Sequence, residues 1–214
     1  MTTARKPILC YVTDRRAFDL SPVPSDFSPS HPRPPGGHSL QDSIRRAAAA
    51  GVAWIQIREK DLDARALVEL ARFAVAETRE TPARVLVNDR LDVALAANAA
   101  GVHLGENSLP VEIVAEWRRR SGRLDFLIGA SCHSLDAARA AERGGANYVF
   151  FGPVFETPSK AAFGAPQGIE RLREVCAAVK IPVLAIGGVN AENLRDCIQA
   201  GAAGIAAIRL FQNQ

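Results

Sequence analysis

The chain has 214 residues, of which 48% are hydrophobic and 23% are charged, and its formal net charge is +3. This composition is that of a globular protein with one sizeable core, so we expect a single domain over residues 1–214. The mild positive charge, without basic runs interleaved with aromatic residues, argues against a nucleic-acid partner and suits small anionic substrates. No apolar run is long enough for a membrane span and the first residues lack a signal-peptide core, so we expect a cytoplasmic protein with no membrane partner.

A short apolar run at residues 7–12 predicts the first strand, and a loop over residues 15–38 follows it. Within that loop, residues 21–37 carry six prolines and end in two glycines, a composition that disfavours both helix and strand. Loops of this length in compact proteins are usually either functional or disordered. The sequence leaves open whether this one is a lid or a disordered insertion.

A helix, a glycine and a buried strand recur along the rest of the chain. The first such unit has helical periodicity from Ser39 to Gly51 and an apolar strand at residues 52–57. The pattern returns three times, and three further apolar runs lie between the units, so that eight predicted strands start near residues 8, 54, 84, 102, 127, 148, 183 and 204. Strands that alternate with helices predict a parallel sheet, and eight of them in about 200 residues predict an α/β fold of the closed (β/α)8 or TIM-barrel type.

Two further features bear on this prediction. A doubly wound open sheet is the main alternative, but no G-x-G-x-x-G pattern follows the first strand. The segment after the last strand, residues 209–214, is too short for a full helix, so we expect the eighth helix to be short or missing. Another element, or a partner subunit in a homo-oligomer, would then cover the flank near the first and last strands.

Polar residues and glycines follow most of the predicted strands. In a TIM barrel the carboxyl ends of all strands meet at one face, where active sites lie. The pair Gly187-Gly188 follows a β-branched strand and predicts a sharp turn whose amide groups suit an anion. Groups that suit phosphate and Mg²⁺ follow other strands, namely Arg58, Glu59, Lys60, Asn88, Asp89, Glu106, Ser108, Ser131, His133, Thr157, Ser159 and Lys160. Together they predict a pocket for a substrate with more than one phosphate.

Some of these positions also have simpler interpretations. Asn88 and Asp89 are both favoured helix N-caps and can equally well cap the next helix. His103 lies inside an apolar strand, where a hydrogen-bonded core histidine is a better interpretation than a ligand. His133 follows a strand end beside hydroxyl groups, which favours a catalytic or substrate-contacting role. The convergence of so many polar residues on one face favours function for the set as a whole.

Six ordered motifs resemble those of the thiamine phosphate synthase and TenI family, and the resemblance covers nearly the whole chain from residue 8 to residue 208. They are Gln56-Ile-Arg-Glu-Lys60, Val87-Asn-Asp-Arg90, Gly101-Val-His-Leu-Gly105, Gly129-Ala-Ser-Cys-His133, Gly152-Pro-Val-Phe-Glu-Thr-Pro-Ser-Lys160 and Ala185-Ile-Gly-Gly188. The family holds two enzyme types, thiamine phosphate synthase and the TenI-type thiazole tautomerase.

For a synthase, the resemblance implies a transferase that joins hydroxymethylpyrimidine diphosphate to a thiazole phosphate and releases diphosphate. Mg²⁺ and cationic side chains would meet the charge that builds on the leaving diphosphate. By resemblance, the pyrimidine diphosphate is held by Gln56, Arg58, Lys60 and Asn88, the Mg²⁺ ion by Asp89, the diphosphate by Ser131 and Lys160, and the thiazole phosphate by Thr157, Ser159, Gly187 and Gly188. The resemblance also makes Lys60, His133 and Lys160 catalytic and Ile208 a substrate contact.

The chain departs from the family pattern at two places. Synthases usually carry a second metal-binding aspartate where this chain has Ser108, a poor replacement for a carboxylate, although Glu106 could reach the metal instead. At the end of the last strand, Arg209 stands where the family usually has a serine near the phosphate. The first departure bears on metal binding and the second on the geometry of the phosphate site.

The resemblance leaves two alternatives to the synthase. A tautomerase moves a proton within a thiazole carboxylate phosphate, which needs an acid/base group such as His133 and a phosphate site but no Mg²⁺. A catalytically silent ligand-binding member would follow if the altered metal site is inactive. We favour the synthase, because a proton shift does not require the complete Arg58, Lys60, Asn88 and Asp89 set.

Overall fold

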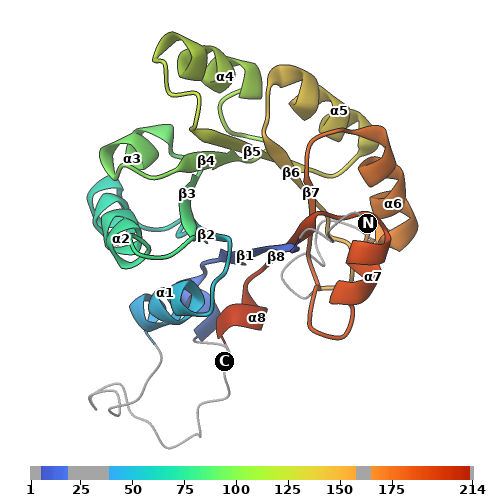
Figure 1. The fold of residues 1–214 in the computed structure, drawn as a ribbon, viewed down its shortest axis with the longest axis horizontal. Coiled ribbons are helices and arrows are strands. Elements are labelled where there is room, and N and C mark those ends of the chain that lie inside the picture. Colours follow the sequence, from blue (N-terminus) through green and yellow to red (C-terminus); the bar gives the residue numbers. More distant parts are fainter. Residues whose placement is uncertain (1–5, 19–38, 158–164, 213–214) are drawn as a thin grey trace, which may run out of the picture.

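The computed structural model describes residues 6–18, 39–157 and 165–212. Eight parallel strands pair in chain order and form a closed ring, in which the first strand pairs with the second and with the last (Figure 1). The strands are β1 (Ile8–Val12), β2 (Trp54–Ile57), β3 (Arg84–Asn88), β4 (Gly101–Leu104), β5 (Leu127–Cys132), β6 (Tyr148–Phe151), β7 (Val183–Ile186) and β8 (Gly204–Ala207). The closed ring confirms the predicted TIM barrel and excludes the open sheet.

Helices surround the barrel on the outside (Figure 1). They are α1 (Leu40–Ala49), α2 (Ala64–Glu77), α3 (Leu91–Ala96), α4 (Val111–Arg120), α5 (Leu135–Gly144), α6 (Gly168–Ala178), α7 (Leu194–Gln199) and α8 (Arg209–Gln212). Short polar side chains cap the starts of several of these helices. At the start of α1, for example, Ser39 and Asp42 form a reciprocal capping box. Within the described ranges, none of the helices combines the length and apolar character that crossing a membrane requires.

The segment after β1 differs from the expected loop at its start. Residues Arg15–Phe18 form one turn of 3-10 helix, η1, rather than irregular chain. A buried glutamate after β2 accepts hydrogen bonds from the backbone of this turn, which explains its regular geometry. The proline-rich part, residues 19–38, lies outside the described residues, so its role as a lid or an insertion stays a prediction.

Strand alternation divides the core into two layers, because successive side chains point to opposite faces of the sheet. The interior cluster fills the inside of the barrel and consists of Cys10, Val12, Leu86, Tyr148, Phe150, Leu184 and Ala206. A larger cluster lies between strands and helices and includes Ile55, Val87, Val102, Ile128 and Val149. The inside of the barrel is therefore a packed core rather than a pore, and a site that is open to substrates can lie only at an end of the barrel.

The last helix is as short as the sequence predicts. α8 has four residues and lies beside α1 (Figure 1). Phe211 of α8 packs against Tyr11 of β1, with ring centroids 5.8 Å apart. The flank near β1 and β8 is therefore covered by α1 and α8, whereas cover by a partner subunit stays a prediction.

Candidate active site

A layer of polar side chains lies above the interior cluster at the carboxyl ends of four neighbouring strands, and we name it the polar layer: Gln56, Asn88, His103 and Ser131. Gln56 and Asn88 stand two residues beyond Trp54 and Leu86, both of which belong to or pack on the interior cluster. Strand alternation therefore turns their side chains inward as well. The register pairs Asn88 with His103 across β3 and β4, which brings two members of the layer side by side.

Hydrogen bonds give the first two amides of the polar layer a fixed orientation. Asn88 Nδ2 donates to Asp89 Oδ2 at 2.6 Å, and because a carboxylate only accepts, the amide nitrogen must face it. Asn88 Oδ1 then accepts from Gln56 Nε2 at 2.8 Å. Gln56 Oε1 is the end of this series; it is buried and has no hydrogen-bond partner among the described residues. A buried acceptor left in this way is costly and fits a ligand that donates a hydrogen bond.

Asp89 has an unusual backbone and several donors to its carboxylate. Its φ is +60°, a left-handed conformation that a non-glycine residue rarely adopts outside sites where the surroundings impose it. Asp89 Oδ1 accepts from the Gly105 amide at 3.0 Å and from the Ser108 hydroxyl. The loop after β4 therefore positions this carboxylate, and the residue is not a helix N-cap, since the residue before α3 is Arg90 and makes no side-chain cap.

The two acidic residues considered for the metal have different partners. Glu106 lies beside His133, with 3.8 Å between Glu106 Oε1 and His133 Nε2, whereas Asp89 contacts Gly105 and Ser108. No group of three or more histidine, cysteine, aspartate or glutamate side chains suited to a metal occurs in the described part of the chain. Asp89 with the Ser108 hydroxyl nevertheless offers two oxygen ligands, a set that holds Mg²⁺ in proteins when substrate phosphates complete the shell.

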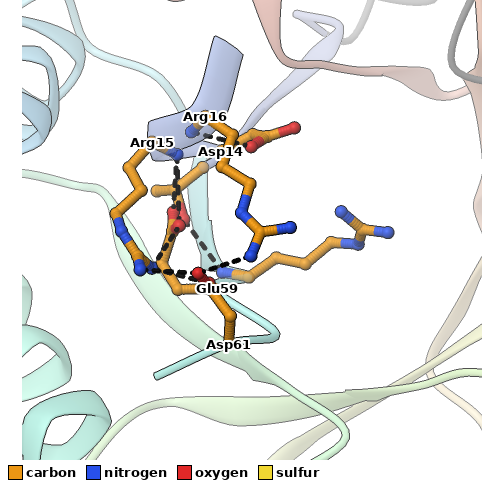
Figure 2. A network of polar contacts seen from close by, with 7 residues as sticks. Asp14, Arg15, Arg16, Glu59 and Asp61 are labelled. Atoms are coloured by element: carbon orange, nitrogen blue, oxygen red, sulfur yellow. Dashed lines mark hydrogen bonds and ion pairs between the residues drawn. The ribbon is translucent and has the colours of Figure 1, made fainter. Parts of the chain in front are cut away.

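The loop after β2 carries Arg58 and Lys60 and is fixed by a polar network that links it to the end of β1 (Figure 2). Glu59 is 4% exposed and accepts from the Arg15 amide at 3.1 and 3.2 Å. Burial raises the pKa of the Glu59 carboxyl, although hydrogen bonds from Thr13 and Arg15 oppose this. The sequence allowed Glu59 to be a solvated loop charge, and its burial was missed because its partners lie 44 residues away.

Exposed ion pairs complete the network on its outer side. Asp61 accepts from the Arg15 guanidinium at 2.7 and 2.6 Å and from Arg16 at 2.8 Å (Figure 2). A cavity of about 270 Å³ opens between the loops after β2 and β3, and it is lined by Ile57, Glu59, Lys60, Leu62, Leu67, Asn88, Asp89 and Arg90. Lys60 is exposed at this cavity, so the structure brings a cation, an amide and a carboxylate to one opening.

The interpretation of His103 as a core histidine is confirmed. The ring is 1% exposed, stacks on Phe150 with centroids 4.1 Å apart, and is hydrogen bonded through both nitrogens. Burial lowers its pKa to about 3; Asp89 opposes this shift and Arg58 adds to it. One of its two partners is Ser131, a predicted substrate contact, so this core residue also reaches the site.

His133 lies at the end of β5, close to the loop after β4. Its Nδ1 contacts the Gly152 carbonyl, which only accepts, so Nδ1 carries the proton and donates. In the neutral ring the lone pair is then on Nε2, on the side of Glu106. An imidazole held in one tautomer with a free lone pair is a suitable proton acceptor.

The glycine pair after β7 is shaped by its contact with the loop after β6. Gly187 and Gly188 have φ values of +90° and +67°. A Cβ at Gly187 would lie 2.6 Å from Pro153, and one at Gly188 would lie 2.7 Å from Phe155 Cβ. Phe155 N donates to Gly187 O at 3.0 Å, so the two loops are joined by backbone as well.

The remaining predicted residues are placed as follows. Thr157 follows the segment that packs on Gly187 and Gly188 and is partly buried. Ile208 directly follows the carboxyl end of β8 and is partly buried against the interior cluster, whereas Arg209 at the start of α8 is exposed. Ser159 and Lys160 lie outside the described residues, and their predicted roles stay predictions.

Comparison with known proteins shows which family this chain resembles. The family model described as thiamine monophosphate synthase matches residues 29–211. A thiamine-phosphate synthase from Methanoculleus marisnigri is 46% identical over 172 residues, which cover 80% of this chain and 80% of the relative. A thiamine-phosphate synthase from Moorella thermoacetica is 44% identical over 173 residues, which cover 81% of this chain and 80% of the relative.

A solved structure supports the same assignment. Thiamine phosphate pyrophosphorylase from Pyrococcus furiosus superposes with a TM-score of 0.76 at 36% identity, covering 95% of this chain and 86% of that one. The matching barrel, the family model and the relatives all extend over most of the chain. The chain therefore belongs to the thiamine monophosphate synthase family.

Proposed function

We propose that this protein is a thiamine-phosphate synthase, a transferase that joins hydroxymethylpyrimidine diphosphate to thiazole phosphate. The observation that carries the proposal is the buried, unpartnered Oε1 of Gln56, held at the end of the Asp89, Asn88 and Gln56 series. The exocyclic amine of the pyrimidine is a donor that would satisfy it. Relatives with this name support the same activity.

The reaction breaks the bond between the pyrimidine methylene carbon and the diphosphate oxygen. The diphosphate leaves with the electron pair, and the thiazole nitrogen then donates its lone pair to the methylene carbon to form the new C–N bond. Arg58 and Lys60 would neutralise the departing charge, and the polar layer would hold the pyrimidine ring in place. The packed aromatic interior below the site supplies a wall that excludes water from the cationic carbon.

Mg²⁺ is the cofactor that we propose for this reaction. Bound to the diphosphate, it would stabilise the negative charge on the leaving oxygens. Asp89 and the Ser108 hydroxyl are the residues that would hold it, and the donors from Gly105 and Asn88 keep the Asp89 carboxylate in position. Because one carboxylate is a small share of the ligands that Mg²⁺ needs, the substrate phosphates would provide most of the others.

The tautomerase is a second candidate because of the geometry of His133. Its fixed tautomer leaves Nε2 as a proton acceptor, and the nearby Glu106 carboxylate would stabilise the imidazolium that results. This candidate needs no metal. A silent ligand-binding member of the family is the third candidate that the same experiment addresses.

The test is product formation by the purified protein with both synthase substrates, in Mg²⁺ and in EDTA, followed by mass spectrometry. We expect thiamine phosphate only with Mg²⁺, and we expect Asp89→Asn to abolish it while Glu69→Gln, on the exposed surface of α2, has no effect. Isomerisation of a thiazole carboxylate phosphate without synthase product would favour the tautomerase. Neither activity, with calorimetric binding of thiazole phosphate, would identify the silent member.

We also propose the cytoplasm as the location, since both substrates are small phosphorylated metabolites. We also propose a homo-oligomer. In it, a second subunit would pack beside the short α8, at the flank of β1 and β8. Sedimentation analysis of the purified protein would determine its oligomeric state.

A further inference from the structure

Three side chains from neighbouring strands form a hydrogen-bonded chain that rises from the barrel interior to the site. Tyr148 of β6 is 3.1 Å from Nδ1 of His103 on β4, and Nε2 of His103 is 2.9 Å from Oγ of Ser131 on β5. Tyr148 and His103 are buried, whereas Ser131 is partly exposed. The direction in which each hydrogen bond runs decides what Ser131 presents to a ligand.

The imidazole of His103 is neutral, since burial at 1% exposure strongly disfavours the charged ring. A neutral imidazole carries one proton, so one ring nitrogen donates and the other accepts. His103 therefore accepts one of its two hydrogen bonds and donates the other, so both bonds point in the same direction along the series from Tyr148 to Ser131.

Tyr148 determines that sense. Its ring is fully buried in the interior cluster, and burial raises the pKa of the phenol well above its usual value, so the hydroxyl keeps its proton. Among the described residues, His103 Nδ1 is the hydrogen-bond partner of this hydroxyl. A buried O–H without an acceptor is costly, so Tyr148 donates to Nδ1. The proton of His103 is then on Nε2 and is donated to Ser131 Oγ.

Gly129 makes this arrangement possible. It lies on β5 against the Tyr148 ring, and a Cβ at this position would overlap the phenol oxygen and its neighbouring carbon atoms. The Tyr148 ring also packs on Trp54, with centroids 4.4 Å apart. The phenol is therefore confined to the position from which it reaches His103.

We infer that Tyr148 and His103 are positioning residues that make the Ser131 hydroxyl a hydrogen-bond donor toward a phosphate oxygen of the substrate. Because the Ser131 oxygen accepts from His103, its own proton is left to point toward the opening of the barrel. A phosphate oxygen only accepts when ionised, so it matches this donor, and the bond is charge-assisted. The inference rests on the proposed synthase function, since it assigns the Ser131 proton to the diphosphate.

The first experiment examines the chain of hydrogen bonds without any substrate. Long-range ¹H–¹⁵N NMR of the ¹⁵N-histidine-labelled protein distinguishes the two neutral tautomers and the imidazolium. We expect His103 to be neutral and protonated on Nε2, and we expect Tyr148→Phe to destroy this preference. A His103 protonated on Nδ1, or charged near neutral pH, would overturn the inference.

The second experiment measures the binding of inorganic diphosphate, with Mg²⁺, by calorimetry on the full chain. Ser131→Ala and Tyr148→Phe should each weaken binding, the former by roughly tenfold, the size expected for one charge-assisted hydrogen bond. Tyr148→Phe should have no further effect in the Ser131→Ala background, because the tyrosine acts through the serine. The matched control is Tyr11→Phe, the other tyrosine of the chain, which is buried outside the interior cluster and should leave binding unchanged.

Additive losses in the double variant would overturn the inference, because they would mean that Tyr148 acts on binding independently of Ser131. The two experiments also separate this inference from the proposed function. Wild-type protein that binds no diphosphate contradicts the synthase and the assignment of the Ser131 proton to a phosphate. An Nδ1 tautomer in a protein that does bind diphosphate contradicts the hydrogen-bond direction alone.

Discussion

At the scale of single residues, Gly187 shows how a backbone position can depend on a neighbouring loop. Its φ of +90° disfavours any side chain, and a Cβ would also lie 2.6 Å from Pro153. Gly51 has a similar φ of +75° but open space around it. Both positions therefore carry the conformational cost of a side chain at positive φ, and only Gly187 adds a steric clash with a neighbouring loop.

We expect Gly187→Ala to lower the free energy of unfolding by about 2 to 4 kcal/mol, whereas Gly51→Ala should cost about 1 kcal/mol. Gly187→Ala should also weaken the binding of thiazole phosphate, because the loop after β6 must shift. Urea denaturation measures the first effect and calorimetry the second. Equal losses for the two variants would mean that the contact with Pro153 contributes nothing.

His103 predicts a pH dependence of stability. Its pKa is about 3 in the folded protein, whereas an ordinary histidine has a pKa of 6.5, so the unfolded chain binds more protons between these values. Stability from this group is complete above pH 6.5 and is lost as the pH falls toward 3, by up to about 1.4 kcal/mol per pH unit. The wild type should therefore lose more stability than His103→Asn between about pH 7 and about pH 5, as measured by urea denaturation. Parallel losses in both proteins would contradict this assignment.

The apolar strand around His103 was sufficient to predict it as a core residue. The hydrogen bonds that join it to Tyr148 and Ser131 could not be predicted, since these residues meet it only through the register of three strands. The same limit applied to Asp89. The position of its carboxylate depends on contacts with Gly105 and Ser108 in the loop after β4. These contacts leave no local pattern in the sequence around Asp89.

At the scale of elements, the network in Figure 2 connects the end of β1 to the loop that carries Arg58 and Lys60. Glu59 is its buried member and Asp61 its half-exposed member. Removal of a buried acceptor leaves the Arg15 amide and the Thr13 hydroxyl without their partner. An exposed ion pair is instead replaced by water at little cost.

Glu59→Ala should therefore lower the free energy of unfolding by about 1 to 3 kcal/mol, whereas Asp61→Ala should leave it nearly unchanged. Glu59→Ala should also raise the KM for the pyrimidine diphosphate, since the loop with Arg58 and Lys60 loses its anchor. Chemical denaturation and steady-state kinetics are the measurements. A loss from Asp61→Ala as large as that from Glu59→Ala would show that the ion pairs, not the buried carboxylate, hold the loop.

The elements themselves were largely predictable, because each strand and helix carries its own periodicity and its own glycine or polar cap. The predicted strand starts agree with the observed strands, and the short α8 follows from the few residues after β8. The helical turn η1 was missed. Its backbone is held by Glu59, and a contact between residues 44 positions apart leaves no local pattern in the sequence.

At the scale of the whole molecule, the barrel depends on the pairing of β1 with β8. Gly204 pairs with Ile8, and a Cβ at this position would overlap the Ile8 carbonyl group. Gly122, in contrast, has φ +69°, and a Cβ there would meet no described atom within 4 Å. The first glycine is required by the closed fold, and the second by its turn alone.

Gly204→Ala should prevent normal closure, and we expect loss of the cooperative unfolding transition and association in size-exclusion chromatography. Gly122→Ala should retain both the monodisperse elution of the wild type and a cooperative transition, with a loss of about 1 kcal/mol. Circular dichroism on heating provides the comparison. A Gly204→Ala protein that melts like the wild type would mean that β1 and β8 can separate without loss of the fold.

The order of strands also affects how the protein is made. A ribosome synthesises β1 first and β8 last, yet these two strands must lie side by side in the finished barrel. Until residue 207 has emerged, β1 and β7 have no partner on one side, and unpaired strand edges attract other chains. The nascent chain is therefore exposed to aggregation for most of its synthesis, and the last strand made removes both edges in one step.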